Sequence, residues 1–185
     1  MGGGSVFWDF EESIDHNVPI ENWRSYRFVA DYVARPLKKE EYCEDMLMQC
    51  IYYGAMMNPE IDVPDVWEHF EKRGYGGFLW YEIDEATNIK RKTPGFNSRT
   101  NKKQQIFSLN RDYIQDHGKR CEHLRILTQW KDIGSISEMT DYDLIPCVGG
   151  CLMAAKGPGI ANQFKEVQEN KEEETWQDIY PMNNY

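Results

Sequence analysis

Residues 27–60 read RFVADYVARPLKKEEYCEDMLMQCIYYGAMMNPE, and this stretch carries the main signal for the fold. Its first part, residues 27–34, alternates apolar and polar side chains as a β-strand does. Pro36 ends this strand, because proline cannot donate a hydrogen bond to a ladder. Apolar residues at helical spacing then predict a helix over residues 39–53, with Gly54 as its C-cap. The stretch therefore begins as a strand and continues as an amphipathic helix.

The alternation of strand and helix periods continues outward from this stretch. A short apolar segment follows the helix and ends in the carboxylate of Glu60. We expect strands at residues 5–10, 27–34, 55–60 and 77–83 in one sheet, with crossover helices at residues 39–53 and 63–73. Further helices are expected at residues 102–115, around residues 124–133 and at residues 144–155. This order predicts an α/β fold, with a mixed sheet and flanking helices.

The length of 185 residues suits one domain with one hydrophobic core. We assign residues 1–4 to a flexible leader, residues 5–156 to the domain and residues 157–185 to an acidic, disordered tail. No window of about 18 apolar residues occurs, which excludes a membrane span. The N-terminus has neither a basic nor an apolar segment and is not a secretion signal. Five cysteines without regular spacing indicate a reducing compartment, not a disulfide framework.

The net charge of −10 is unevenly distributed along the chain. Ten Lys or Arg and only three acidic residues lie between Lys90 and Arg125, so a basic segment is set within an acidic body. Such a segment permits local contact with nucleic-acid phosphates, and the alternative is a solvated loop and helix surface. The candidate DNA-binding residues are Lys90, Arg91, Lys92, Arg99, Lys102 and Lys103.

Three carboxylates are candidate metal ligands. Glu60 ends a strand that follows a helix, and sites in open α/β sheets lie outside the carboxyl ends of strands. Asp141 and Asp143 precede the helix expected from residue 144, where the ordinary role of an aspartate is to cap the helix. Hydrolysis of a phosphodiester needs an activated water and a stabilised leaving oxygen, which two divalent cations held by Asp and Glu supply. These residues therefore predict a site for two Mg²⁺ or Mn²⁺ ions.

Other kinds of site have weaker signals. A zinc site can be drawn from His117, Cys121 and His123 with Cys147 and Cys151, but the spacings match no common zinc pattern, and packing cysteines are the alternative. A phosphate loop of the Gly-x-x-x-x-Gly-Lys-Ser/Thr type is absent from the sequence.

The order of the segments resembles the C-terminal nuclease domain of the large terminase subunit of tailed phages. The similar stretches are residues 27–36, the helix of residues 41–53, Asn58-Pro59-Glu60, the helix that ends at Arg73-Gly74-Tyr75, residues 94–104, and residues 140–154. In the last of these, an aspartate-rich motif opens a helix of small residues. Together the stretches extend over residues 5–156.

The resemblance implies an RNase H-like fold, two divalent metal ions and endonuclease cleavage of concatemeric double-stranded DNA. Glu60 matches the second acidic position of the family, and Asp143 its last, with Asp141 as a neighbouring candidate. The first aspartate of the family lies on a strand that we do not find in this sequence, and Asp9 is the candidate substitute. The implied partners are the terminase ATPase domain, the portal and the small terminase subunit, and the implied location is the host cytoplasm.

Two classes of function follow from the sequence. The first is a metal-dependent DNA endonuclease of the genome-packaging machine. The second is a truncated or degenerate nuclease-like module that binds DNA or docks on a packaging partner without cutting. An unrelated acidic interaction protein is a third reading. The first two classes differ in whether a complete set of carboxylates exists.

Overall fold

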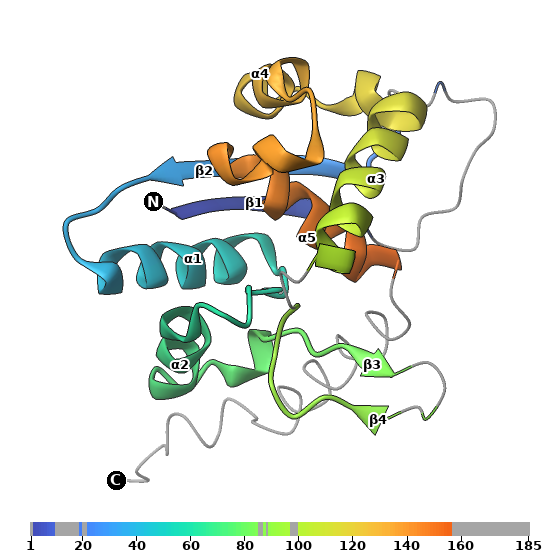
Figure 1. The fold of residues 1–185 in the computed structure, drawn as a ribbon. Helices are drawn as coiled ribbons and strands as arrows, with labels where there is room; N and C mark the ends of the chain where they lie inside the picture. The colour runs from blue at the N-terminus through green and yellow to red at the C-terminus, as the bar shows by residue number, and fades with distance from the viewer. Residues whose placement is uncertain are drawn as a thin grey trace, which may run out of the picture.

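The structure is a computed structural model, and it describes residues 2–9, 19, 22–84, 87, 89–96 and 100–156. The elements in chain order are β1 (Gly2–Trp8), β2 (Arg27–Ala34), α1 (Lys39–Tyr53), α2 (Pro64–Lys72), η2 (Gly76–Phe78), β3 (Ile83–Asp84), β4 (Ile89–Lys90), α3 (Thr100–His117), η3 (Gly118–Arg120), α4 (Leu124–Asp132), η4 (Ile136–Asp141) and α5 (Leu144–Lys156) (Figure 1). The fold is mixed α/β, as expected. The acidic tail assigned to residues 157–185 lies outside the described residues.

Strand β1 lies between helices on both of its faces. It pairs with β2 in antiparallel register, with Ser5 opposite Asp31. A Cβ atom on Gly4 would lie 2.8 Å from Met46 Sδ of α1, whereas a Cβ atom on Gly3 would lie 3.0 Å from the Asp143 Cβ beside α5. Because successive Cβ atoms of a strand point to opposite faces, α1 covers one face of β1 and α5 the other.

The leader that the sequence predicts at residues 1–4 is therefore wrong for Gly2, Gly3 and Gly4. These residues form the first part of β1. Their missing side chains let the two helices approach the strand, and larger residues here would collide with Tyr42, Asp143 or Met46. The glycine run is thus a packing feature that resembles a flexible leader in sequence.

Helix α1 has the bounds that the sequence predicts. Its buried stripe consists of Cys43, Met46, Leu47 and Cys50. Gly54 has a φ of 61° and donates its N–H to the Cys50 carbonyl, which confirms it as the C-cap. Helix α2 packs against this stripe, and its Val66 and Phe70 form a second core with Leu79. The helix predicted at residues 63–73 is therefore confirmed within one residue at each end.

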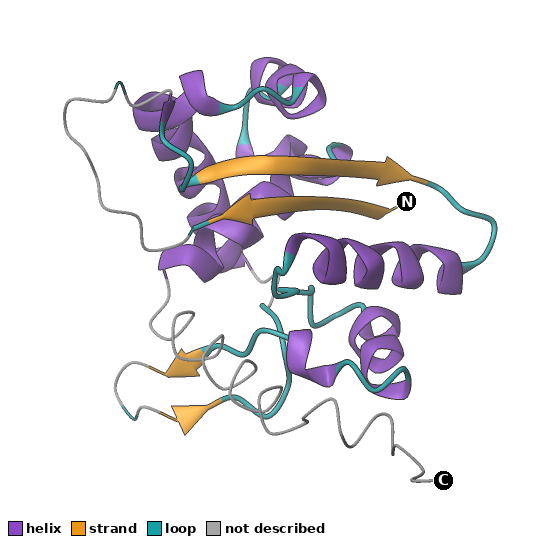
Figure 2. Cartoon of the chain, turned by 180° about the vertical axis from the view of Figure 1, so that it is seen from behind, coloured by secondary structure: helices purple, strands orange, loops and turns teal. Residues whose placement is uncertain are grey.

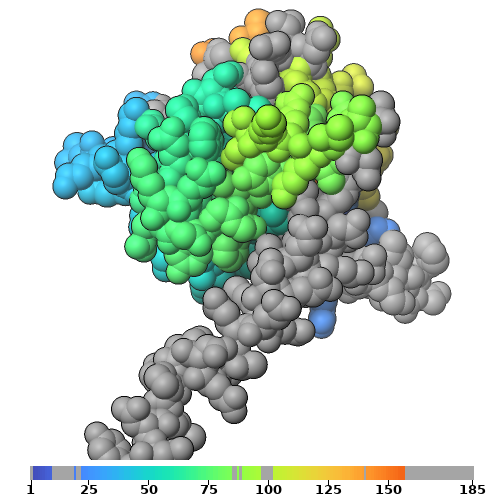
Figure 3. All heavy atoms as spheres, turned by 90° about the horizontal axis from the view of Figure 1, so that it is seen from below, coloured from blue at the N-terminus to red at the C-terminus, as the bar shows by residue number. Residues whose placement is uncertain are grey.

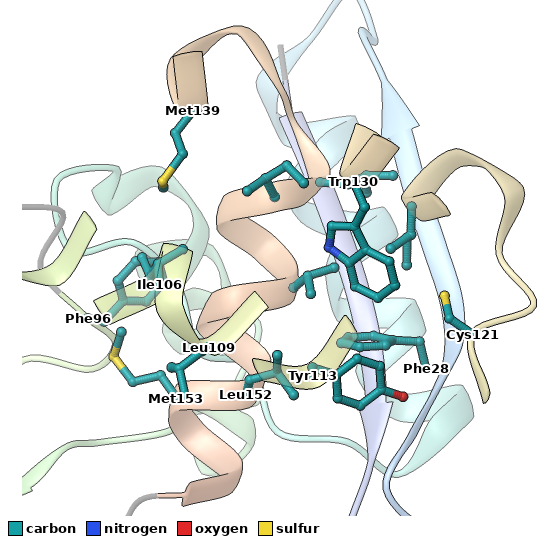
Figure 4. Close-up of a cluster of buried hydrophobic side chains, with 14 residues drawn as sticks. Phe28, Phe96, Ile106, Leu109, Tyr113, Cys121, Trp130, Met139, Leu152 and Met153 are labelled. Carbon is teal, nitrogen blue, oxygen red and sulfur yellow. The ribbon is translucent and has the colours of Figure 1, made fainter. Parts of the chain in front are cut away.

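The larger core fixes α5 against α3, α4 and β2 (Figure 4). The rings of Phe28 and Tyr113 lie 5.2 Å apart, and those of Tyr113 and Trp130 lie 5.8 Å apart. Buried Asn110 accepts a hydrogen bond from Trp130 Nε1 at 2.8 Å and donates one to the Ile145 carbonyl at 3.2 Å. These contacts set the position of α5 and of the residues that precede it.

The single four-stranded sheet that we expected is not formed in the described part of the chain. β1 pairs only with β2 and β3 only with β4, both antiparallel, and the two small sheets lie on different parts of the molecule (Figure 2). Residues 55–60 and 77–83 are joined by one isolated parallel bridge, Met57 to Leu79, and two further bridges, Glu60 to Phe96 and Tyr81 to Gly95, join them to residues 95–96. Proline at position 59 removes a ladder donor, so these segments form single bridges and no long ladder.

The second small sheet consists of β3 and β4, which are close in sequence. β4 pairs with β3 through Ile83 opposite Lys90. Seen from below, this region adjoins the part of the surface made by α2 and the residues that follow it (Figure 3). Among the described helices, none has the length and apolar character needed to cross a membrane. All five cysteines are free.

Candidate metal site in a central cavity

A cavity of about 1770 Å³ lies between β1 and residues 54–60. Its other two sides are formed by α1 and α5, which pack on the opposite faces of β1. We call it the central cavity. The side chains that reach it from α1 and α5 include Met46, Cys50, Pro146, Cys147, Cys151 and Ala154. These walls are largely apolar, with carboxylates at particular points.

Glu60 reaches the central cavity from the bridged segment that follows α1. The backbone on both sides of it is fixed, because Phe96 donates its N–H to Pro59 O at 2.9 Å and Ile61 donates to Phe96 O at 2.8 Å. Asn58 Nδ2 donates to the Gly150 carbonyl of α5 at 2.8 Å. The segment that carries Glu60 is therefore attached to the helix that Asp143 precedes.

Asp143 reaches the same cavity from the residue before α5. An aspartate at this position ordinarily caps the following helix. Leu144, the first residue of the helix, donates its N–H to Gln129 Oε1 at 2.9 Å. The Asp143 carbonyl accepts the Cys147 thiol at 3.1 Å. The Asp143 carboxylate is half-buried and lines the cavity.

Glu60, Asp143 and Cys147 line the same cavity. Burial is the main cause that raises the pKa of the Cys147 thiol, and the charges of Cys151, Asp143 and Glu60 raise it further. The two carboxylates therefore belong to one cavity wall, although they come from separate parts of the chain. Paired carboxylate oxygens are the ligands that Mg²⁺ and Mn²⁺ prefer, so this donor set fits a hard divalent cation.

The other two carboxylates predicted for the site lie elsewhere. Asp141 is exposed at the end of η4 and does not line the central cavity. Asp9 lines the cavity, but it follows the far end of β1. Gly3 is the β1 residue next to Asp143, and Asp9 lies six positions further along the chain, roughly 20 Å away for an extended segment. Glu60, Asp143 and Asp9 thus all line the central cavity, with Asp9 at the opposite end of β1 from Asp143.

Local burial still affects the carboxyl group of Asp9. Its side chain is exposed, yet neighbouring atoms desolvate it enough to raise its pKa. Desolvation of this kind favours the neutral form and is no sign of a cation partner.

The predicted DNA-binding residues lie apart from the central cavity, and none of those described lines it. Lys90 lies over the Tyr81 ring at 4.4 Å. Glu82 binds both Arg91 and Lys102, each at 2.9 Å. Lys92 is exposed and Lys103 half-buried, while Arg99 lies outside the described residues. Arg91 and Lys102 therefore share one carboxylate, whose single negative charge offsets one of their two positive charges.

The two histidines of the alternative zinc site make ordinary structural contacts. His123 makes hydrogen bonds through its two ring nitrogens with Asp31 Oδ2 at 3.0 Å and Phe28 O at 3.2 Å. His117 packs against the Tyr26 ring with a centroid distance of 4.9 Å. Within the described ranges, no group of three or more His, Cys, Asp or Glu side chains is arranged to hold a metal ion.

Sequence reasoning missed three residues of the cavity wall. Asn58 and Trp80 line the cavity, and Asn58 Oδ1 and Trp80 Nε1 are buried without a hydrogen-bond partner. The third is Cys147, for which the sequence predicts only a packing role or a zinc-binding role. Its position one helical turn after Asp143, on a helix of small residues, was the available signal.

Comparison of the chain with protein-family models, with curated proteins and with solved structures gave no match.

Proposed function

We propose that the chain is a metal-dependent DNA endonuclease module with an RNase H-like fold, of the kind found in the large terminase subunit of tailed phages. The observation that supports the proposal is that Glu60 and Asp143, which come from separate parts of the chain, both line the central cavity with Cys147. A shared role at this cavity is the simplest reason for two sequence-predicted carboxylates to line it.

Two Mg²⁺ or Mn²⁺ ions bound at this site would supply an activated water and stabilise charge on the leaving oxygen. Glu60 and Asp143 would hold the ions through carboxylate oxygens. The bridge at Phe96 and the Asn58 contact with α5 keep the two carboxylates in place. The proposed substrate is concatemeric double-stranded DNA, and the proposed partners are the terminase ATPase domain, the portal and the small subunit in the host cytoplasm.

The cutting assay uses supercoiled plasmid at high protein concentration with Mn²⁺. We expect slow nicking by the unmodified chain, no nicking with EDTA, and loss of nicking in both Glu60→Gln and Asp143→Asn. Asp141→Asn is the matched control and should nick as the unmodified chain does, because Asp141 lies outside the cavity wall. Nicking that neither Glu60→Gln nor Asp143→Asn reduces would reject this site. Binding of DNA without any nicking would favour the non-catalytic class.

Contact with DNA should depend on the lysines that are not already paired with a carboxylate. Replacing Lys92 and Lys103 together with alanine should lower the slope of log K against log salt by about two, one for each lost phosphate contact. Lys102→Ala should change the slope much less, because Glu82 already holds this ammonium group at 2.9 Å. Fluorescence anisotropy with a labelled duplex at several salt concentrations measures both slopes. An unchanged slope in the double variant would show that DNA contacts residues outside the basic segment.

A further inference from the structure

The segment that carries Glu60 is extended. Pro59 O accepts the Phe96 N–H at 2.9 Å, and Ile61 donates its N–H to Phe96 O at 2.8 Å. These main-chain groups, two positions apart, point to one side, as alternate residues of an extended chain do. The side chains of Asn58 and Glu60 are likewise two positions apart, so they lie on one face of the segment. Both residues line the central cavity.

This face of the segment is turned toward α5. Asn58 Nδ2 donates to the Gly150 carbonyl of that helix at 2.8 Å. Phe96, the bridge partner of Glu60, packs there as well, because a Cβ atom on Gly150 would lie 3.0 Å from its ring. Bridge partners present their side chains to the same face of a sheet. Asn58 and Glu60 therefore both face the helix that Asp143 precedes.

The side-chain amide of Asn58 has one defined orientation. Only the NH₂ group of an amide can donate to a carbonyl, so the contact with Gly150 O assigns Nδ2 to α5 and leaves Oδ1 as an acceptor. Oδ1 is buried and has no hydrogen-bond partner. Trp80 of the same wall does not supply one, since it is 3% exposed and its Nε1 is also buried without a partner. A buried acceptor without a partner is unfavourable, so Asn58 Oδ1 indicates a ligand.

We propose that Asn58 Oδ1 is a further oxygen ligand of the divalent cation site that Glu60 and Asp143 form. The inference rests on the cation site of the proposed function, but it does not depend on DNA cleavage. Amide carbonyl oxygens bind hard divalent cations, as carboxylate oxygens do. Two such side chains on one face of an extended segment, as Asn58 and Glu60 are, can bind one ion together.

The neutral amide also suits the charge of this site. Within the residues that the structure describes, no third Asp, Glu, His or Cys side chain completes a metal-binding group. Asn58 supplies an oxygen without adding a negative charge beside Glu60 and Asp143. Repulsion among the ligands in the absence of an ion is therefore smaller than it would be with three carboxylates.

The test measures the Kd of Mn²⁺ for the full chain by isothermal titration calorimetry, without DNA. Asn58→Ala and Asn58→Asp both remove the hydrogen bond to Gly150, but only Asn58→Asp keeps an oxygen at this position. We expect Asn58→Ala to raise the Kd by about tenfold or more. Asn58→Asp should bind Mn²⁺ at least as tightly as the unmodified chain, because a charged ligand is the stronger one. Asn22→Ala, at an exposed residue that does not line the cavity, is the matched control and should leave the Kd unchanged.

A second measurement uses the unmodified fold and does not depend on the stability of a variant. The chain is labelled with ¹³C at the side-chain carbonyl of asparagine, and electron–nuclear double resonance is recorded on bound Mn²⁺. A directly bound amide should give a resolved ¹³C coupling. The coupling should persist in Asn22→Ala and disappear in Asn58→Asp, which has no labelled asparagine at the site.

Equal Kd values for the unmodified chain and Asn58→Ala would overturn the proposal, and so would an equal rise in Asn58→Ala and Asn58→Asp or a missing ¹³C coupling. Weaker Mn²⁺ binding in Glu60→Gln and Asp143→Asn beside an unchanged Asn58→Ala would reject the role of Asn58 and keep the cation site. Mn²⁺ binding that depends on Asn58 in a chain that does not nick DNA would reject the nuclease and keep this inference. A lack of Mn²⁺ binding by the unmodified chain would reject both.

Discussion

Saturating Mn²⁺ should raise the melting temperature of the chain by about 5–10 °C, and Glu60→Gln or Asp143→Asn should each remove this rise. A ligand that binds only the folded state at 100 times its Kd stabilises it by about 2.7 kcal/mol. For a domain of this size each kcal/mol corresponds to roughly 2–4 °C. Differential scanning calorimetry with and without Mn²⁺ measures the shift.

The same pair of variants should behave differently when metal is absent. Each substitution then removes a negative charge from beside another carboxylate, so the melting temperature should stay the same or rise slightly. Asp141→Asn should retain the full Mn²⁺ shift, because this residue is exposed outside the cavity wall. A Mn²⁺ shift of equal size in Glu60→Gln and Asp143→Asn would place the bound ion elsewhere.

Gly95→Ala should destabilise the fold by roughly 3 kcal/mol or more, through strain and collision acting together. Gly95 has a φ of 91°, a conformation that residues with side chains rarely adopt. An added Cβ atom would also collide with the Pro59 carbonyl oxygen, a main-chain atom that accepts the Phe96 N–H at 2.9 Å. This carbonyl belongs to the bridged segment that holds Glu60, so the variant should also lose the rise in melting temperature with Mn²⁺.

Gly74→Ala is the matched control for this substitution. Gly74 has a φ of 79°, but an added Cβ atom there meets nothing within 4 Å. Gly74→Ala should lower the free energy of unfolding only by the strain of the backbone conformation, about 1–2 kcal/mol. Chemical denaturation of both variants gives the two free energies of unfolding. Equal losses in Gly95→Ala and Gly74→Ala would show that the close approach of Gly95 to Pro59 does not contribute.

The helices could be predicted from the sequence because their signals are local. The apolar stripe of α1 and its glycine cap define both of its ends within the helix itself. The sheet could not be predicted from the sequence, because strand pairing depends on contacts between distant segments. Gly2, Gly3 and Gly4 read as a leader, and only the helices α1 and α5 on the two faces of β1 explain them.

For the candidate site, the sequence identifies Glu60 and Asp143 by their positions at the ends of elements, and these positions are local properties. The distance of Asp9 from Asp143 along β1, and the pairing of Lys102 with Glu82, depend on tertiary structure and have no counterpart in the sequence pattern. The unpartnered polar atoms of Asn58 and Trp80 likewise become visible only when burial is known.

A crystal structure of the full chain grown with Mn²⁺, with anomalous diffraction data, tests the shared metal site most directly. We expect an anomalous peak within about 2.0–2.6 Å of a carboxylate oxygen of Glu60 and of Asp143, at the wall of the central cavity. A peak that contacts neither residue, or ordered Glu60 and Asp143 side chains without a Mn²⁺ ion between them, would contradict it.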